Sequence, residues 1–192
     1  MPEPVRRYPA MAPKDGTGAI TGWVVDRSSG PHGVASATFD ATRTYRYRLT
    51  RAWDPGSPVV AFVMLNPSTA DADHLDPTVR RCVGFARDWG FGALEVVNLF
   101  AFRATAPADL VRAPEPVGVG NDRAIVDAVR RADRVVVAWG TRGTHLGRGV
   151  AVSALLGSCR VRPVALGTTR DGHPRHPLYV RGDTASEPWL PA

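Results

Sequence analysis

Cysteine is scarce in this sequence of 192 residues: only Cys82 and Cys159 occur, and their spacing is not typical of metal ligands. An iron–sulfur cluster therefore has no basis here. No acidic cluster follows any apolar segment either, so we expect no metal site and no cofactor. Both thiols are expected to act as small apolar groups in a reducing cytoplasm, which predicts a cytoplasmic protein.

Long apolar runs are also absent. No stretch of about 18 apolar residues occurs, so no membrane span or membrane partner is expected. The segment from Met1 to Lys14 has no apolar centre and does not resemble a secretory signal. A length of 192 residues fits one domain with a sizeable core.

Lysine is nearly missing, because Lys14 is the only one and arginine supplies almost all of the positive charge behind the net charge of +6. Arginine binds phosphate and stacks on bases, so the composition favours DNA or a nucleotide as partner. A genome-wide preference for arginine, with a charge that serves only solubility, explains the same composition. Both interpretations stay open at this point.

The chain divides into three expected segments. Residues 1–33 are rich in Pro, Gly, Ser and Thr and predict a flexible N-terminal tail, residues 34–182 a single α/β domain, and residues 183–192 a C-terminal tail. The domain begins with an expected antiparallel hairpin. In its second strand, Arg46 and Arg48 alternate with apolar residues, which predicts one solvent-facing side.

Four continuous apolar runs predict strands that are covered on both faces, at residues 59–65, 94–100, 134–139 and 161–166. Apolar residues at helical spacing between the runs predict helices at residues 77–89, 121–132 and 149–156, with Asp76 as the cap of the first. Strands that alternate with helices are typical of a parallel α/β sheet with right-handed crossovers.

Polar and aromatic side chains follow the carboxyl ends of these strands, where ligands bind in such sheets. They are Asn66 and Ser68 after the first run, Asn98, Phe100, Phe102 and Arg103 at the second, Arg142 after the third, and Arg175, His176 and Tyr179 after the fourth. Amides, hydroxyls, aromatic rings and arginines are suited to holding a neutral polar ring together with an anion.

Three motifs carry a family resemblance: "MLNPSTADA", continued by "DPTVRRCVGFARDWGFGALEVVNLFAFRAT", then "AWGTRG" and "PRHPLYV". Together they closely resemble DUF1643, a bacterial domain family of unknown function. The resemblance extends from about Tyr45 to Val180 and implies no activity by itself.

A more distant resemblance links the same motifs to the uracil-DNA glycosylase superfamily of DNA repair. It implies that Asn66 positions a water, Asn98 reads the base, His176 contacts the flipped base, and Tyr179 acts as a wedge or stacking residue. Two positions depart from that pattern: Leu178 replaces a serine, and Asn66 replaces the aspartate of the most active branch. The resemblance therefore implies a weak glycosylase at most.

These observations predict a three-layer αβα fold of uracil-DNA-glycosylase-like type, with a central four-stranded parallel sheet and an N-terminal antiparallel hairpin. The expected function is hydrolysis of the N-glycosidic bond of a modified or damaged base in DNA. A hydrolase or transferase of free nucleotides and a non-catalytic reader of modified bases are the alternatives.

The expected site residues fall into three groups. Asn66 and His176 are the candidate catalytic residues. The candidate base-binding residues are Asn98, Phe100, Phe102, Ser68 and Tyr179. The candidate phosphate-binding residues are Arg80, Arg81, Arg103, Arg142 and Arg175.

Overall fold

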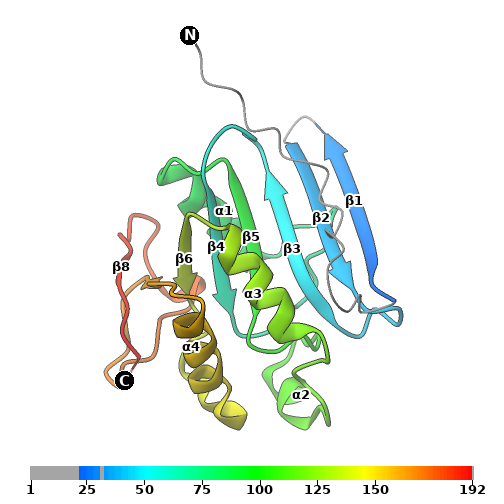
Figure 1. The fold of residues 1–192 in the computed structure, drawn as a ribbon, viewed down its shortest axis with the longest axis vertical. Helices are drawn as coiled ribbons and strands as arrows, with labels where there is room; N and C mark the ends of the chain where they lie inside the picture. Colours follow the sequence, from blue (N-terminus) through cyan, green and yellow to red (C-terminus); the bar gives the residue numbers. More distant parts are fainter. Residues whose placement is uncertain (1–21, 31–32, 192) are drawn as a thin grey trace.

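The computed structural model describes residues 22–30 and 33–191, which form one mixed sheet with helices on both faces (Figure 1). The sheet has eight strands in the order β1-β2-β3-β5-β4-β6-β7-β8. Their bounds are β1 Val24–Gly30, β2 Gly33–Phe39, β3 Arg46–Ala52, β4 Val59–Met64, β5 Ala93–Asn98, β6 Arg134–Val137, β7 Val164–Ala165 and β8 Glu187–Pro188. The helices are α1 Pro77–Asp88, α2 Pro107–Arg112, α3 Asn121–Arg131 and α4 Arg148–Ser158, with 3-10 segments η1 Thr141–Gly147 and η2 Pro177–Tyr179.

The prediction of a four-stranded parallel sheet with an added hairpin is wrong for the sheet as a whole. Four of its seven neighbouring strand pairs are antiparallel. The parallel pairs are β5 with β4, β4 with β6, and β6 with β7. The hairpin of β2 and β3 pairs directly with β5, so its strands extend the main sheet rather than standing apart from it. This edge lies at the right of Figure 1.

Two apolar cores cover the two faces of the sheet, which explains why β4 and β5 are buried along their whole length. On one face, α1 contributes Val79, Cys82 and Phe85 to a core that includes Phe62 of β4. On the other face, α3 and α4 pack over Val63 and Val97, and both helices lie in front of the sheet in Figure 1. Successive residues of a strand point to opposite faces, so each buried strand supplies both cores.

The chain ends of the domain carry structure that composition did not predict. Strand β1 lies within the expected N-terminal tail and pairs along its length with β2, while Trp23 stacks on Tyr47 with ring centroids 4.8 Å apart. Residues 1–21 lie outside the described part of the chain. Strand β8 lies within the expected C-terminal tail, and Trp189 beside it is buried. In the described ranges, no helix has the length and apolar character needed to cross a bilayer.

Candidate functional site

The turn after β4 is fastened to the segment after β5 by the side chain of Asn66. Its Nδ2 donates to the carbonyl oxygen of Ala104 at 2.7 Å and to that of Pro67 at 2.9 Å. The amide of Ala104 in turn donates to the carbonyl of Pro67 at 2.9 Å. The donor capacity of Asn66 is therefore used within the protein, and its Oδ1 is the atom that can accept a bond from a water or ligand.

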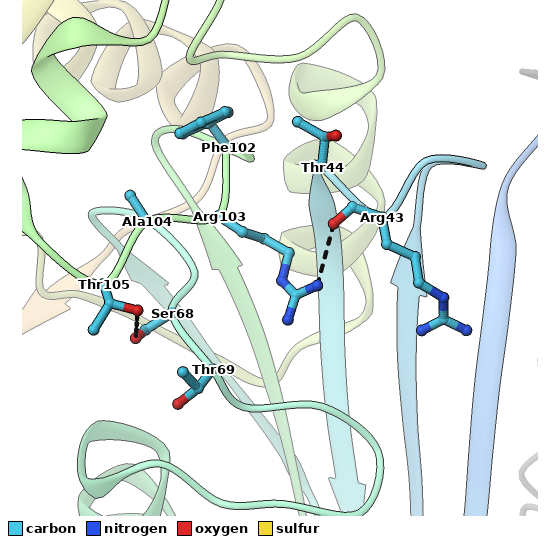
Figure 2. Close-up of a pocket in the computed structure, with 8 residues that line it drawn as sticks. All are labelled: Arg43, Thr44, Ser68, Thr69, Phe102, Arg103, Ala104 and Thr105. Carbon is cyan, nitrogen blue, oxygen red and sulfur yellow. Dashed lines mark hydrogen bonds between the residues drawn. The ribbon is translucent and has the colours of Figure 1, made fainter.

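These two segments form one side of a pocket of about 330 Å³ at the carboxyl edge of β4 and β5 (Figure 2). The turn between β2 and β3 closes the other side. The lining consists of two arginines, four hydroxyl side chains, one aromatic ring and one alanine: Arg43, Arg103, Thr44, Ser68, Thr69, Thr105, Phe102 and Ala104. No carboxylate lines it, and of its two arginines only Arg43 has an ion-pair partner among the described residues, so Arg103 favours an anionic ligand.

The guanidinium groups of both pocket arginines pack against the same aromatic ring. The guanidinium carbons of Arg43 and Arg103 lie 5.0 and 5.2 Å from the ring centroid of the buried Phe39. Arg43 also makes a bidentate pair with Asp26 of β1, with both N···O distances at 2.7 Å. The side-chain hydrogen bonds from Arg43 lower the pKa of Asp26. Arg103 donates only to the carbonyl of Arg43, at 3.1 Å, and its buried Nε has no partner, so Arg103 is the less committed cation of the two.

Of the predicted base-binding residues, Ser68 and Phe102 line this pocket. The Ser68 hydroxyl lies 3.5 Å from that of Thr105, and Phe102 packs edge-on against Tyr45 with centroids 6.0 Å apart. Phe100 is instead fully buried against His145. It belongs to the core of the α3 and α4 face and is not a ring on which a base can stack in this conformation.

Asn98 stands at the carboxyl end of β5, but it is only 1% exposed and lines no open pocket. Neither its Nδ2 nor its Oδ1 has a hydrogen-bond partner. The backbone of Asn98 is held from the face of the sheet that α3 covers. There, Nδ2 of Asn121 donates to the carbonyls of Asn98 and Leu99 at 3.0 and 2.9 Å. The main chain of Asn98 is thus fixed while its side chain is left unsatisfied.

His176 begins the 3-10 segment η2 and is half-buried beside the end of β6. Its Nδ1 accepts a bond from the amide of Leu178 at 3.4 Å, which leaves Nε2 to carry the proton of the neutral ring. Burial lowers the pKa of His176, and the charge of Asp76 opposes this shift. The ring is therefore neutral at pH 7 and has an N–H to donate. Tyr179 lies against it, with centroids 5.7 Å apart, and is 78% exposed.

The five predicted phosphate-binding arginines do not share one surface pocket. Arg103 lines the pocket at β4 and β5, whereas Arg80 and Arg81 line a second pocket on α1. Arg81 holds the loop of His176, since its guanidinium donates to the carbonyls of Pro177 and Val180. Arg142 is exposed in η1, and Arg175 donates to the carbonyl of Thr168 at 3.0 Å.

Sequence reasoning overlooked Arg43 and Thr44, which lie in a turn between strands. Thr69 and Thr105 lie within the family motifs, but no role was assigned to them. It was wrong about Arg46, which was expected to face solvent and is 1% exposed. A register shift between β2 and β3 at Thr38 and Phe39 interrupts the simple alternation there. The guanidinium of Arg46 then donates to the carbonyl of Ala70, so the turn after β4 covers it.

The fold and site define an α/β protein with a cationic, hydroxyl-lined pocket at the carboxyl edge of its parallel strands. The chain belongs to the family described as "Protein of unknown function (DUF1643)", whose model matches residues 46–178. This confirms the family resemblance seen in the motifs. No curated protein and no solved structure matches the chain, so the resemblance to uracil-DNA glycosylases has no support from relatives.

Proposed function

We propose that this protein is a nucleobase-recognising hydrolase that cleaves the N-glycosidic bond of a modified or damaged base in DNA. The observation that carries the proposal is the pocket at the carboxyl edge of β4 and β5, where Arg103 meets four hydroxyls, while Arg43 borders the pocket and pairs with Asp26. Guanidinium and hydroxyl donors of this kind bind phosphate oxygens, and they fix a nucleotide without reading its base.

The proposed chemistry uses Asn66, which holds the turn at this pocket, and His176, which lies outside the pocket lining. Hydrolysis adds water across the bond between the sugar and the base: the water oxygen bonds to the sugar carbon, and the bonding electrons and a proton go to the base. Oδ1 of Asn66 can orient that water, and the Nε2–H of neutral His176 can donate to the oxygen of the departing base. An amide is a poor base, so the expected rate is low.

A uracil-DNA-glycosylase-like fold forms part of this proposal. Four strands run parallel in the order β5-β4-β6-β7 within the larger sheet, and Asn66 and His176 follow the first and last of them in the chain. Ligands of such sheets bind outside the carboxyl ends of the strands. Fold alone does not define the reaction, so the proposal depends on the site.

The test is the formation of abasic sites in oligonucleotides that carry uracil, hypoxanthine, oxidised or hypermodified pyrimidines. We expect slow product formation on one base, a loss of about tenfold or more in His176→Gln, and weaker substrate binding in Arg103→Met. Arg112→Gln is the matched control, because Arg112 is an exposed arginine on α2 outside the pocket. Product formation that is equal in all variants would contradict the assigned roles.

A non-catalytic reader of modified bases is the second candidate, and the position of His176 favours it. Ser68 and Phe102 line the open pocket and His176 does not, so a base held there would have no proton donor from His176 in the described conformation. A reader would bind oligonucleotides with an affinity that falls as salt rises and would leave every base in place. A nucleotide hydrolase would instead act on free nucleotides with little dependence on strand length.

A further inference from the structure

Arg46 is a buried cation without a counterion. Its side chain is 1% exposed, and no carboxylate in residues 22–30 or 33–191 lies within ion-pair distance of it. Its recorded side-chain hydrogen bond goes to the carbonyl of Ala70, and its Nε has no partner. Arginines are almost never fully buried unless they are paired, so this position lacks a partner that its chemistry requires.

Asn98 presents a second unsatisfied group on the same face of the sheet. Its neighbour in the register of β4 is Met64, and Met64 packs in the core beneath α1 together with Ala70. The backbone amide of Arg46 donates to the carbonyl of Ala101, three residues beyond Asn98, at 2.9 Å. The strand pairing thus places a buried guanidinium and a free carboxamide on the same face of the sheet, near the paired ends of β3 and β5.

The carboxylates near this location are not paired with Arg46. Arg51 and Arg103 act on Arg46 as like charges, and Asp76 and Asp71 act as opposite charges. Asp73 also acts on Arg51. Asp71 and Asp76 are also engaged elsewhere: Asp71 accepts from the amides of Asp73 and His74, and Asp76 caps α1. Neither carboxylate makes an ion pair with the guanidinium of Arg46.

We propose that Arg46 and Asn98 form an inner anion site beneath residues 69–75, and that its ligand is a small planar heterocyclic anion. The guanidinium supplies charge and donors, and the carboxamide supplies one donor and one acceptor side by side, which matches the N–H and C=O edge of a pyrimidine. The assignment of a heterocycle rests on the proposed function, since the base departs as an anion in N-glycosidic cleavage. The anion site itself does not.

Entry requires the turn to move. Thr69 lines the open pocket, and Ala70, the next residue, accepts the bond from Arg46, so only the turn separates the pocket from the inner site. Figure 2 shows Thr69 and Arg103 in the lining of the open pocket. Residues 69–75 contain no helix or strand; the carbonyl of Asp71 is held by Arg51, and that of His74 by Arg51 and by the amide of Asp71. Displacement of the turn exchanges the carbonyl of Ala70 for the ligand.

The first measurement is thermal unfolding of the full chain with barbiturate, a pyrimidine that is anionic at neutral pH, beside uracil, which is neutral. Barbiturate is expected to raise the Tm by about 5 °C or more when its free concentration is about a hundredfold above its Kd, and uracil is expected to raise it much less. Inorganic phosphate is the third probe. A shift with phosphate and none with barbiturate would overturn the assigned ligand class.

The second measurement uses Asn98→Asp, which places a carboxylate beside Arg46. This internal anion is expected to raise the Tm by about 2 °C or more and to abolish the barbiturate shift. Asn121→Asp is the matched control: Asn121 is equally buried, but it lies on the other face, donates to two carbonyls and is expected to lower the Tm.

Two outcomes would overturn the inner site. One is a fall in Tm for Asn98→Asp as large as that for Asn121→Asp, and the other is an unchanged barbiturate shift in Asn98→Asp. The result is separable from the proposed function. Barbiturate binding without any base release from oligonucleotides would support the inner site and contradict the proposed hydrolase activity. Base release without barbiturate binding would support the hydrolase activity and contradict the inner site.

Discussion

Arg81 is predicted to control the position of His176 without contributing to the stability of the rest of the fold. Its guanidinium reaches from α1 to the carbonyls of Pro177 and Val180, and its carbon centre lies 5.3 Å from the ring centroid of Phe85. The bond to Pro177 is long, at 3.4 Å, so the bond to Val180 carries most of the interaction. Charge-assisted bonds of this kind contribute about 1.5–3 kcal/mol each, so Arg81→Met is expected to cost the loop about 2–3 kcal/mol.

The consequence is local opening of η2. A cost of that size corresponds to an opening that is about 30- to 150-fold more frequent, because each 1.4 kcal/mol is a factor of about ten. Amide hydrogen exchange measures this directly at Tyr179, whose amide donates to the carbonyl of His176 at 3.0 Å. Protection of Tyr179 is expected to fall by that factor, while the amides of β4 and β5 keep theirs.

Arg80→Met is the control, because Arg80 is exposed and makes only one long contact, at 3.4 Å, with the carbonyl of Leu75. It removes the same charge from the neighbouring position of the same helix. Unchanged protection of Tyr179 in Arg81→Met, or an equal loss in both variants, would refute the assignment of Arg81 as the clamp of this loop.

Three further predictions concern stability. The folded pKa of His176 lies below its unfolded value of about 6.5, so the unfolded chain takes up the proton first and the stability of the fold decreases as the pH drops below about 6.5. The decrease in Tm from pH 7.5 to pH 5.5 should therefore be smaller in His176→Gln than in the wild type. Equal decreases in the two proteins would contradict the lowered pKa. Asp76→Ala removes the cap bond to Val79 and should cost about 1 kcal/mol in urea unfolding, whereas Asp76→Asn should cost less. Phe62→Ala should cost about 3–5 kcal/mol, because Phe62 is fully buried and stacks on Trp89, and a smaller loss in Phe62→Leu checks the packing argument.

Most elements of the fold were predictable where one physical signal dominated. The apolar runs at β4 and β5 predicted buried strands, and Asp76 followed by Pro77 predicted the start of α1. The apolar pattern did not predict the two edge strands of the sheet. Strand β1 is mostly exposed and carries no apolar pattern, and β8 is only two residues long, so neither differs from a loop in composition.

The pocket was predictable only in part, for a geometric reason. Residues that follow the strand ends, such as Ser68 and Arg103, could be placed at the carboxyl edge from the strand pattern alone. Arg43 comes from a turn whose approach to that edge depends on the pairing of β3 with β5. No periodicity in a single sequence encodes which strand lies beside which, so this half of the pocket required the structure.

At Arg46, the alternation of polar and apolar residues in the strand gave a wrong prediction of exposure, because a turn distant in the sequence buries the side chain. The residue lies in a strand with polar neighbours, and its burial is produced by the turn at Ala70, 24 positions away. Asp76 links this turn to the opposite end of the edge, since its charge acts on both Arg46 and His176. The proposed inner site and the proposed proton donor thus share one neighbouring carboxylate, at the N-cap of α1.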